Sequence, residues 1–297
     1  MFCTSDQRRR QHSPFSNRHR IALERLFQRI SELSTLPSIA QEIFRVANRP
    51  DAKVDELREI IQKDVALAAS ILRRVNSAFF GGRHKVSDLR AAITMLGFRE
   101  IRSLCLTIFV SRMFDRPGKY RDYTRENLWR HCMATAIVAR KIARVTELLP
   151  PDEAYVAGLL HHVGTILLDQ HLRGQFCELI EKLDEATPTH LIEREIFSFD
   201  QGQLAEFVLT RWNFPEAICE AVRYYRYPEI YIGPHRVLVA TVSLANYLCS
   251  RAGWTSLGIH NIASPRDETY SSLGLEHHVV SVIWDELQSS LAELGDF

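Results

Sequence analysis

The chain has 297 residues, of which 46% are hydrophobic and 25% charged, and its 37 basic and 36 acidic residues give a net charge of +1. This length allows one large domain or two moderate ones, and the composition is typical of a globular protein. The nearly balanced charge excludes an overall electrostatic attraction to nucleic acid or to an anionic membrane.

The beginning of the chain is unusually basic. Residues 1–20 contain five arginines and a single acid, Asp6. Because this segment is polar and lacks apolar periodicity, we expect residues 1–18 to form a disordered basic tail. Contact with nucleic acid is the alternative interpretation of such a run, although we do not expect a nucleic-acid partner overall. The segment also lacks the apolar stretch of a secretory signal.

Two further absences indicate the compartment. No run of about 18 apolar residues marks a transmembrane helix, so no membrane partner is expected. The cysteines are widely spaced and form no CxxC pair, which favours reduced thiols in a cytoplasmic protein. They are Cys3, Cys105, Cys132, Cys177, Cys219 and Cys249.

Apolar residues at helical spacing predict an all-α fold, since no run of alternating β-branched residues indicates a sheet. In the first half, helices are expected over about 21–30, 37–47, 51–62, 65–75, 88–96 and 99–113. Asp64 and either Ser87 or Asp88 are expected to cap helices, and Gly97 to break one. The loop at residues 79–82 (Phe-Phe-Gly-Gly) is either a ligand-binding loop or a helix C-cap with its aromatic rings in the core.

The loop at residues 115–118 (Asp-Arg-Pro-Gly) is the best internal boundary. It predicts an N-terminal helical lobe of about 22–114 and a second lobe of about 121–230. Helices in the rest of the chain are expected over about 124–146, 151–168, 171–186, 189–198, 200–211, 215–225 and 234–251. A loop over 252–274 and a last helix over 276–293 follow, so that residues 231–297 would pack as C-terminal helices on the second lobe.

The most informative stretch is the apolar run from Tyr155 to Leu168, which contains the adjacent His161 and His162. A helix this apolar is expected to be buried, and a buried imidazole needs a hydrogen-bonding partner. His131 lies on the apolar face of the preceding predicted helix, so the three imidazoles can face one another. They are either hydrogen-bonded core histidines or a metal site.

Several motifs in this chain resemble the HDOD family, a branch of the HD-domain superfamily. The first half carries Leu36-Pro37, Asp64, residues 72–81 (Leu-Arg-Arg-Val-Asn-Ser-Ala-Phe-Phe-Gly) and residues 92–97 (Ala-Ile-Thr-Met-Leu-Gly). The second half carries residues 129–131 (Trp-Arg-His), 158–164 (Gly-Leu-Leu-His-His-Val-Gly) and 212–215 (Trp-Asn-Phe-Pro). The resemblance covers about residues 22–230 and implies a two-lobed helical bundle with an HD-domain-like second lobe.

The resemblance also implies where metal ligands would lie. HD-superfamily phosphohydrolases hold a divalent metal with a histidine, a His-Asp pair and a later aspartate. The first histidine corresponds to His131, and the pair to His161 and His162, so that a histidine replaces the aspartate. The later aspartate corresponds to Asn246. Further family histidines correspond to Gln201, Tyr224 and Tyr225.

These replacements weaken the expected metal site. A hard divalent ion prefers carboxylate oxygens, which imidazole and amide groups do not supply. If His161 and His162 lie on one helix, they point about 100° apart and do not readily reach one ion. We therefore expect no cofactor, metal or enzymatic activity. Three-histidine binding of one divalent metal, and a metal-dependent phosphohydrolase acting on a nucleotide or cyclic dinucleotide, are the alternatives.

The resemblance implies a bacterial signalling or regulatory protein that acts by binding. Its expected site is the degenerate pocket of His131, His161, His162, Gln201, Tyr224, Tyr225 and Asn246. The expected partner is a protein in a signalling pathway, linked to two-component or cyclic-dinucleotide signalling. The tyrosines from Tyr224 to Tyr231, with Arg223 and Arg226, form either an interface or a helix end that packs on the C-terminal helices.

Overall fold

The computed structural model describes residues 21, 24–26, 30, 37–47, 49, 51–76, 86–184, 186–258, 262–275, 280 and 283–284. The basic tail over 1–18, the loop at 79–82 and most of the helix expected over 276–293 lie outside these residues. The regular secondary structure of the described chain is helical except for one small hairpin. In it, β1 (Lys119–Tyr120) pairs antiparallel with β2 (Tyr123–Thr124). The all-α class is therefore confirmed. None of the described helices is long and apolar enough to cross a membrane.

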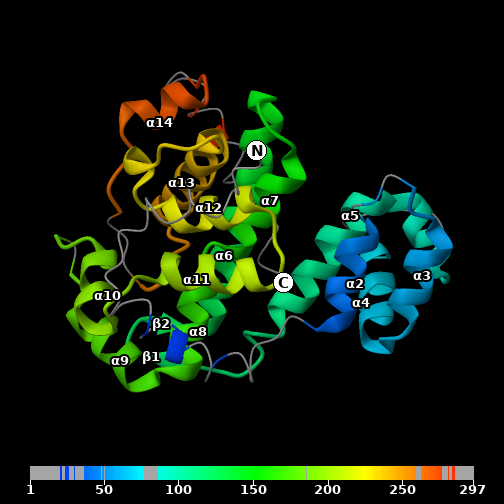
Figure 1. Cartoon of the computed structure of the whole chain (residues 1–297), viewed down its shortest axis with the longest axis horizontal. Coiled ribbons are helices and arrows are strands. Elements are labelled where there is room, and N and C mark those ends of the chain that lie inside the picture. Colours follow the sequence, from blue (N-terminus) through cyan, green and yellow to red (C-terminus); the bar gives the residue numbers. More distant parts are fainter. Residues whose placement is uncertain are drawn as a thin grey trace, which may run out of the picture.

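The smaller lobe is a helical layer at one end of the molecule (Figure 1). It consists of α2 (Ser38–Ala47), α3 (Val54–Gln62), α4 (Val65–Val75) and the first part of α5 (Leu89–Ser111). Both predicted caps are confirmed: the Asp64 carboxylate accepts from the backbone N–H of Leu67 at 2.9 Å, and Asp88 caps α5. The core of this lobe is aliphatic, and its fully buried members include Ile43, Leu57 and Ile71.

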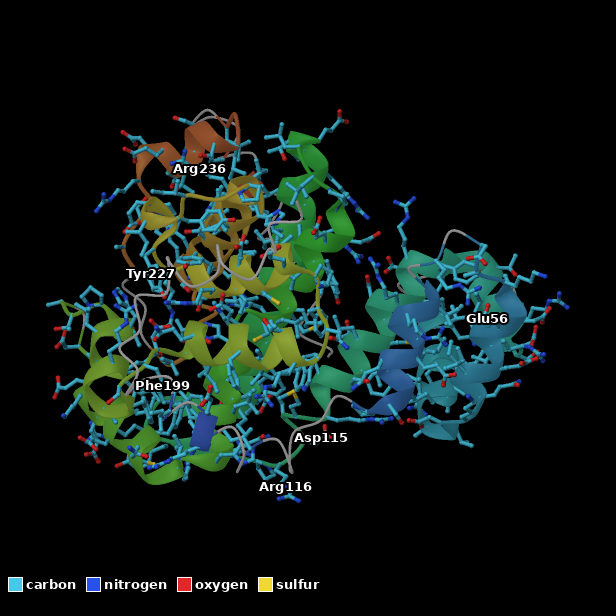
Figure 2. All side chains as sticks on the ribbon, in the orientation of Figure 1. Glu56, Asp115, Arg116, Phe199, Tyr227 and Arg236 are labelled. Carbon is cyan, nitrogen blue, oxygen red and sulfur yellow. The ribbon has the colours of Figure 1, made fainter. Side chains whose placement is uncertain are left out.

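Helix α5 connects the two lobes. Gly97 interrupts it with φ +78°, which confirms the predicted break, because this region of backbone space favours glycine. Beyond Gly97, Ile101 and Cys105 belong to the smaller core, whereas Leu106 and Val110 belong to the larger core. The boundary loop lies after this shared helix, and Figure 2 shows Asp115 and Arg116 on the connection between the lobes. One helix therefore serves both cores.

The larger lobe contains the remaining helices. They are α6 (Arg125–Thr146), α7 (Pro151–Leu160), α8 (Val163–His171), α9 (Arg173–Lys182), α10 (Thr189–Phe197), α11 (Gln201–Arg211), α12 (Glu216–Tyr224), the 3₁₀ helix η2 (Pro228–Ile230), α13 (Arg236–Arg251) and α14 (Asp267–Ser272). Helix α6 lies at the centre and packs on α7 and α13. The expected loop over 252–274 was wrong in part, since α14 lies within it. Six residues are too few for an apolar period to reveal a helix.

The single helix expected around His161 and His162 was also wrong. Helix α7 ends at Leu160 and α8 begins at Val163, so the two histidines form a turn. The helices on either side have different neighbours. A Cβ added at Gly158 would lie 2.8 Å from Ala136 of α6, and one at Gly164 would lie 2.1 Å from the Gln201 carbonyl at the start of α11. The chain changes direction because each glycine permits a close approach to a different helix.

Specific contacts hold the two lobes together. The Thr107 hydroxyl of α5 lies 2.8 Å from the Tyr155 hydroxyl of α7. The Arg140 guanidinium of α6 pairs with Glu100 of α5 at 3.3 Å and lies over the Tyr155 ring. Trp212 and Phe214 pack partly buried against both cores. These contacts fix the position of α7, and with it that of the histidine turn.

Candidate functional site

The three histidines form one buried cluster. His131 of α6 and His161 are fully buried, and His162 is 1% exposed. Their rings lie in contact, with centroids 4.3 to 5.2 Å apart. One nitrogen of each ring lies within 4.8 Å of the others, which is a geometry that can hold a metal ion. The turn between α7 and α8 thus brings both adjacent imidazoles to the same place, which one continuous helix would not do.

Each ring is oriented through its Nδ1 atom. His131 Nδ1 lies 2.5 Å from the Trp254 carbonyl oxygen, and His161 Nδ1 lies 2.5 Å from the Gly158 carbonyl oxygen. His162 Nδ1 contacts the Thr165 hydroxyl at 2.8 Å. Because a carbonyl only accepts, Nδ1 of His131 and of His161 must carry the proton. The Nε2 atom of each of these neutral rings then carries a lone pair.

These two lone pairs face each other. The Nε2 atoms of His131 and His161 are 3.2 Å apart, and Asn246 Oδ1 lies 3.0 Å from His131 Nε2. Two lone pairs at this distance repel unless a proton or a cation lies between them. Nitrogen ligands about 2.0–2.1 Å from zinc in a tetrahedral site would lie about 3.3 Å apart. This pair of nitrogens therefore fits two ligand positions of a borderline metal such as zinc.

Burial keeps the imidazoles neutral. It lowers the pKa of His131 to about 4 and the pKa values of His161 and His162 well below their ordinary value. The imidazoles also disfavour charge on one another. Neutral imidazole is the form that binds a metal, so a metal needs no prior deprotonation here.

Tyr225 and Gln201 lie beside the cluster. The Tyr225 hydroxyl is 3.5 Å from His162 Nε2, and it accepts hydrogen bonds from Gln201 Nε2 at 3.1 Å and Arg226 Nε at 2.9 Å. Burial raises the pKa of Tyr225, so the phenol stays protonated. Gln201 Oε1 is buried without a hydrogen-bond partner.

Six of the seven expected site residues therefore lie together, and Tyr224 does not. Its ring contacts Tyr227 and Tyr231, with centroids 6.0 and 5.1 Å apart. Adjacent positions of α12 point in different directions, so only Tyr225 of the pair reaches the histidines.

No carboxylate belongs to the cluster within the described part of the chain. Glu193 lies one layer out, where it pairs with Arg226 at 2.9 Å and accepts from the backbone N–H of Gln201 at 2.9 Å. Its pKa is raised by burial. The oxygens of Glu193 are thus directed at Arg226 and at the start of α11.

The run from Tyr224 to Tyr231 is not an exposed interface. Tyr225, Tyr227 and Tyr231 are 5% exposed or less, and Arg223 is 4% exposed. Tyr227 donates to Asp200 at 3.1 Å, and Arg223 pairs with the same carboxylate at 3.3 Å. The burial supports the interpretation as a packed helix end, because the polar ends of Tyr227 and Arg223 contact the buried Asp200 rather than solvent.

The sequence predicts a pocket at His162 and Asn246 but not the remaining walls of the cavity of about 530 Å³ that lies beside the cluster. Its walls come from Asp184, residues 186–190, the end of α12, η2, α13, Ser256, Leu257 and residues 262–266, and His162 and Asn246 lie in its lining. Most of the walls are loops that lack apolar periodicity. The only signal in the sequence was the pair of polar positions Ser243 and Asn246 within the apolar α13.

With this geometry established, comparison with known proteins identifies the family. The HDOD domain model matches residues 33–228. The chain belongs to the HDOD domain family. An uncharacterized protein of Treponema pallidum is 27% identical over 221 residues, which are 73% of this chain and 42% of that relative. The chain thus spans less than half of the length of this curated relative.

Solved structures agree with the fold. An HDOD domain protein of unknown function from Geobacter sulfurreducens is 25% identical, with a TM-score of 0.76 over 92% of this chain and 96% of that chain. A proposed signal transduction protein from Marinobacter aquaeolei is 26% identical, with a TM-score of 0.77 over 92% of this chain and 63% of that chain. A proposed phosphohydrolase from Shewanella amazonensis is 21% identical, with a TM-score of 0.67 over 91% of this chain and 94% of that chain, which shows the shared fold alone.

Proposed function

We propose that this HDOD chain is a non-catalytic regulatory protein that acts by binding, in bacterial signal transduction. One observation carries the proposal. The positions that correspond to metal-binding aspartates hold His162 and Asn246, and within the described residues no carboxylate oxygen lies among the imidazoles.

The chemistry of the donor set supports this proposal. Hydrolysis of a phosphate ester by a metal-dependent enzyme requires an ion that binds phosphate oxygen and water, and a base for that water. Hard ions of this kind prefer oxygen ligands. The imidazoles of this cluster are buried, and Arg226 pairs with the nearest acid, Glu193. The site therefore suits recognition better than turnover.

The biological setting is proposed from the relatives. The Marinobacter protein, whose fold and sequence are similar, is described as a signal transduction protein. For this chain we propose a protein partner in such a pathway, linked to two-component or cyclic-dinucleotide signalling. The chain would act through contact with that protein or through a ligand bound in the degenerate pocket around His162 and Asn246.

A second candidate is a metal-dependent phosphohydrolase acting on a nucleotide or cyclic dinucleotide. The observation that favours it is the convergence of the Nε2 atoms of His131 and His161 while carbonyls orient both rings. These two histidines and His162 would hold a borderline metal, which would supply Lewis-acid polarisation of a phosphate ester. Because His161 and His162 lie in the turn between α7 and α8 rather than on one helix, their rings need not point about 100° apart.

Turnover decides between the two candidates. The experiment measures metal content by elemental mass spectrometry and hydrolysis of cyclic dinucleotides, with and without added zinc, manganese or iron. The regulatory proposal expects no turnover under any of these conditions, whether or not metal is bound. Turnover that is lost in His161→Ala and kept in His171→Ala would establish the enzyme instead, because His171 lies at the end of α8 outside the cluster.

A further inference from the structure

The cavity beside the histidines has polar side chains that lack protein partners. Ser243, Asn246 and Ser256 are each at least nine-tenths buried, at 7%, 8% and 8% exposure. All three line the cavity. Within the described residues, neither serine hydroxyl has a hydrogen bond, and the Asn246 amide contacts only the histidines, with Oδ1 3.0 Å from His131 Nε2. Their side chains are largely buried but line the cavity, so their unpaired polar atoms are available to a ligand that enters it.

From these groups we propose that the cavity binds a small aromatic heterocycle through its uncharged hydrogen-bonding edge. Hydroxyl and amide groups match ring nitrogens, amino groups and carbonyls, since each can donate or accept. The inference rests on the proposed binding function and names the class of ligand that the same site takes.

The charges around the cavity argue against an anionic group at this depth. Arg226 pairs with Glu193 at 2.9 Å, and Arg194 pairs with Asp200. The third arginine of the lining, Arg266, is exposed, and Asp184 and Glu229 also line the cavity. An anion buried against Ser243 and Asn246 would lose hydration without meeting an unpaired cation, which is costly. An uncharged edge avoids that cost.

The walls suit a flat ring. Tyr225, Tyr227 and Tyr247 line the cavity together with Leu257 and Pro228. Aromatic and apolar side chains of this kind stack on heterocycles, and a volume of about 300–1,000 Å³ is usual for small-molecule sites. Figure 2 shows Tyr227 on the side of the larger lobe that faces away from the smaller lobe. Access to the cavity therefore does not require the lobes to separate.

Calorimetric titration of the full chain tests the proposal, with adenosine, guanosine, cytidine and uridine as uncharged probes and inorganic phosphate as the anionic probe. We expect at least one nucleoside to bind and inorganic phosphate not to compete. Ser243→Ala should weaken that binding by about 2- to 12-fold, the equivalent of one lost neutral hydrogen bond.

Ser250→Ala is the matched control. Ser250 lies on the same helix, is buried and also has an unpartnered hydroxyl, but it is not part of the cavity lining. Binding by Ser250→Ala should equal that of the unmodified chain. The heterocycle proposal is overturned if no nucleoside binds, if phosphate displaces the nucleoside, or if both serine variants weaken binding equally. Any of these results leaves the non-catalytic proposal intact, since only turnover of a phosphodiester contradicts that one.

Discussion

At the residue scale, the sequence predicts which side chains are buried better than it predicts their partners. His131, His161 and His162 were expected to be buried and close together, because each lies in an apolar helical pattern. The carbonyl that orients His131 belongs to Trp254, which is 123 residues away in the chain. No local pattern encodes such a partner. The same limit explains why Tyr224 and Tyr225 could not be separated before the direction of α12 was known.

Tyr225→Phe should destabilise the fold, because the Tyr225 hydroxyl accepts hydrogen bonds from Gln201 and Arg226. Its removal leaves the buried Gln201 donor and the partly buried Arg226 donor without this acceptor, at an expected cost of about 1–3 kcal/mol in the free energy of unfolding. Urea denaturation measures this change. Tyr224→Phe is the control and should change stability by less than about 0.5 kcal/mol, because it leaves the aromatic contacts of that ring in place. Equal losses of unfolding free energy in the two variants would show that the hydrogen bonds of Tyr225 do not stabilise the fold.

At the element scale, helix positions and caps were largely predictable, and changes of helix direction were not. Thr124, Asp64 and Asp88 cap helices as their residue types indicate. The turn at His161 was not predicted, because glycines occur within helices as well, and what matters here is the close approach of α6 and α11 to Gly158 and Gly164, which the sequence does not show. Packing between helices therefore decides the feature that forms the site.

Gly164→Ala should disrupt the approach of α8 to α11. The added Cβ would lie 2.1 Å from the backbone carbonyl oxygen of Gln201, so the helices must separate. We expect a loss of about 1–3 kcal/mol or more in the free energy of unfolding, as for other overpacked sites. Gly174→Ala in α9 meets nothing within 4 Å and should be neutral or stabilising by up to about 1 kcal/mol. Thermal unfolding of the two variants gives the comparison, and equal melting temperatures would contradict the tight contact.

Asp64 should make stability depend on pH in the acidic range. Its hydrogen bond from the Leu67 N–H lowers its pKa, and the pair with Arg112 at 3.2 Å acts in the same direction. An acid with a lowered folded-state pKa stabilises above its unfolded value of about 3.9, and this contribution is lost as the pH falls through the folded-state pKa. Asp64→Ala should cost about 0.5–2 kcal/mol at pH 7, the usual worth of an N-cap.

The difference between Asp64→Ala and the unmodified chain should start to shrink below about pH 4, where Asp64 of the unfolded chain becomes protonated, and should be smallest below the lowered folded-state pKa. Urea denaturation at pH 7 and at progressively lower pH measures it. Glu59 on α3 is exposed, so Glu59→Ala serves as the control for loss of one carboxylate. A difference that stays constant with pH would show that the charge of Asp64 does not contribute.

At the scale of the whole molecule, the two-lobed arrangement was predictable, but the way the lobes are joined was not. The loop at residues 115–118 indicated a boundary by its composition. The structure instead shares α5 between the cores, with Ile101 on the smaller core and Leu106 on the larger one. A helix that is apolar on two sides gives no periodic signal of which side meets which core. The lobes are therefore mechanically coupled despite their separate cores.

This coupling predicts that the lobes unfold together. All four tryptophans, the first of which is Trp129, follow the boundary loop, so their fluorescence reports mainly on the larger lobe. Ile93→Ala, a change in the core of the smaller lobe, should cost about 2–5 kcal/mol. If α5 and the Thr107–Tyr155 contact couple the cores, urea transitions followed by tryptophan fluorescence and by far-ultraviolet circular dichroism should coincide, and both should shift to lower urea in the variant. A dichroism transition that precedes an unshifted fluorescence transition would show instead that the smaller lobe unfolds alone.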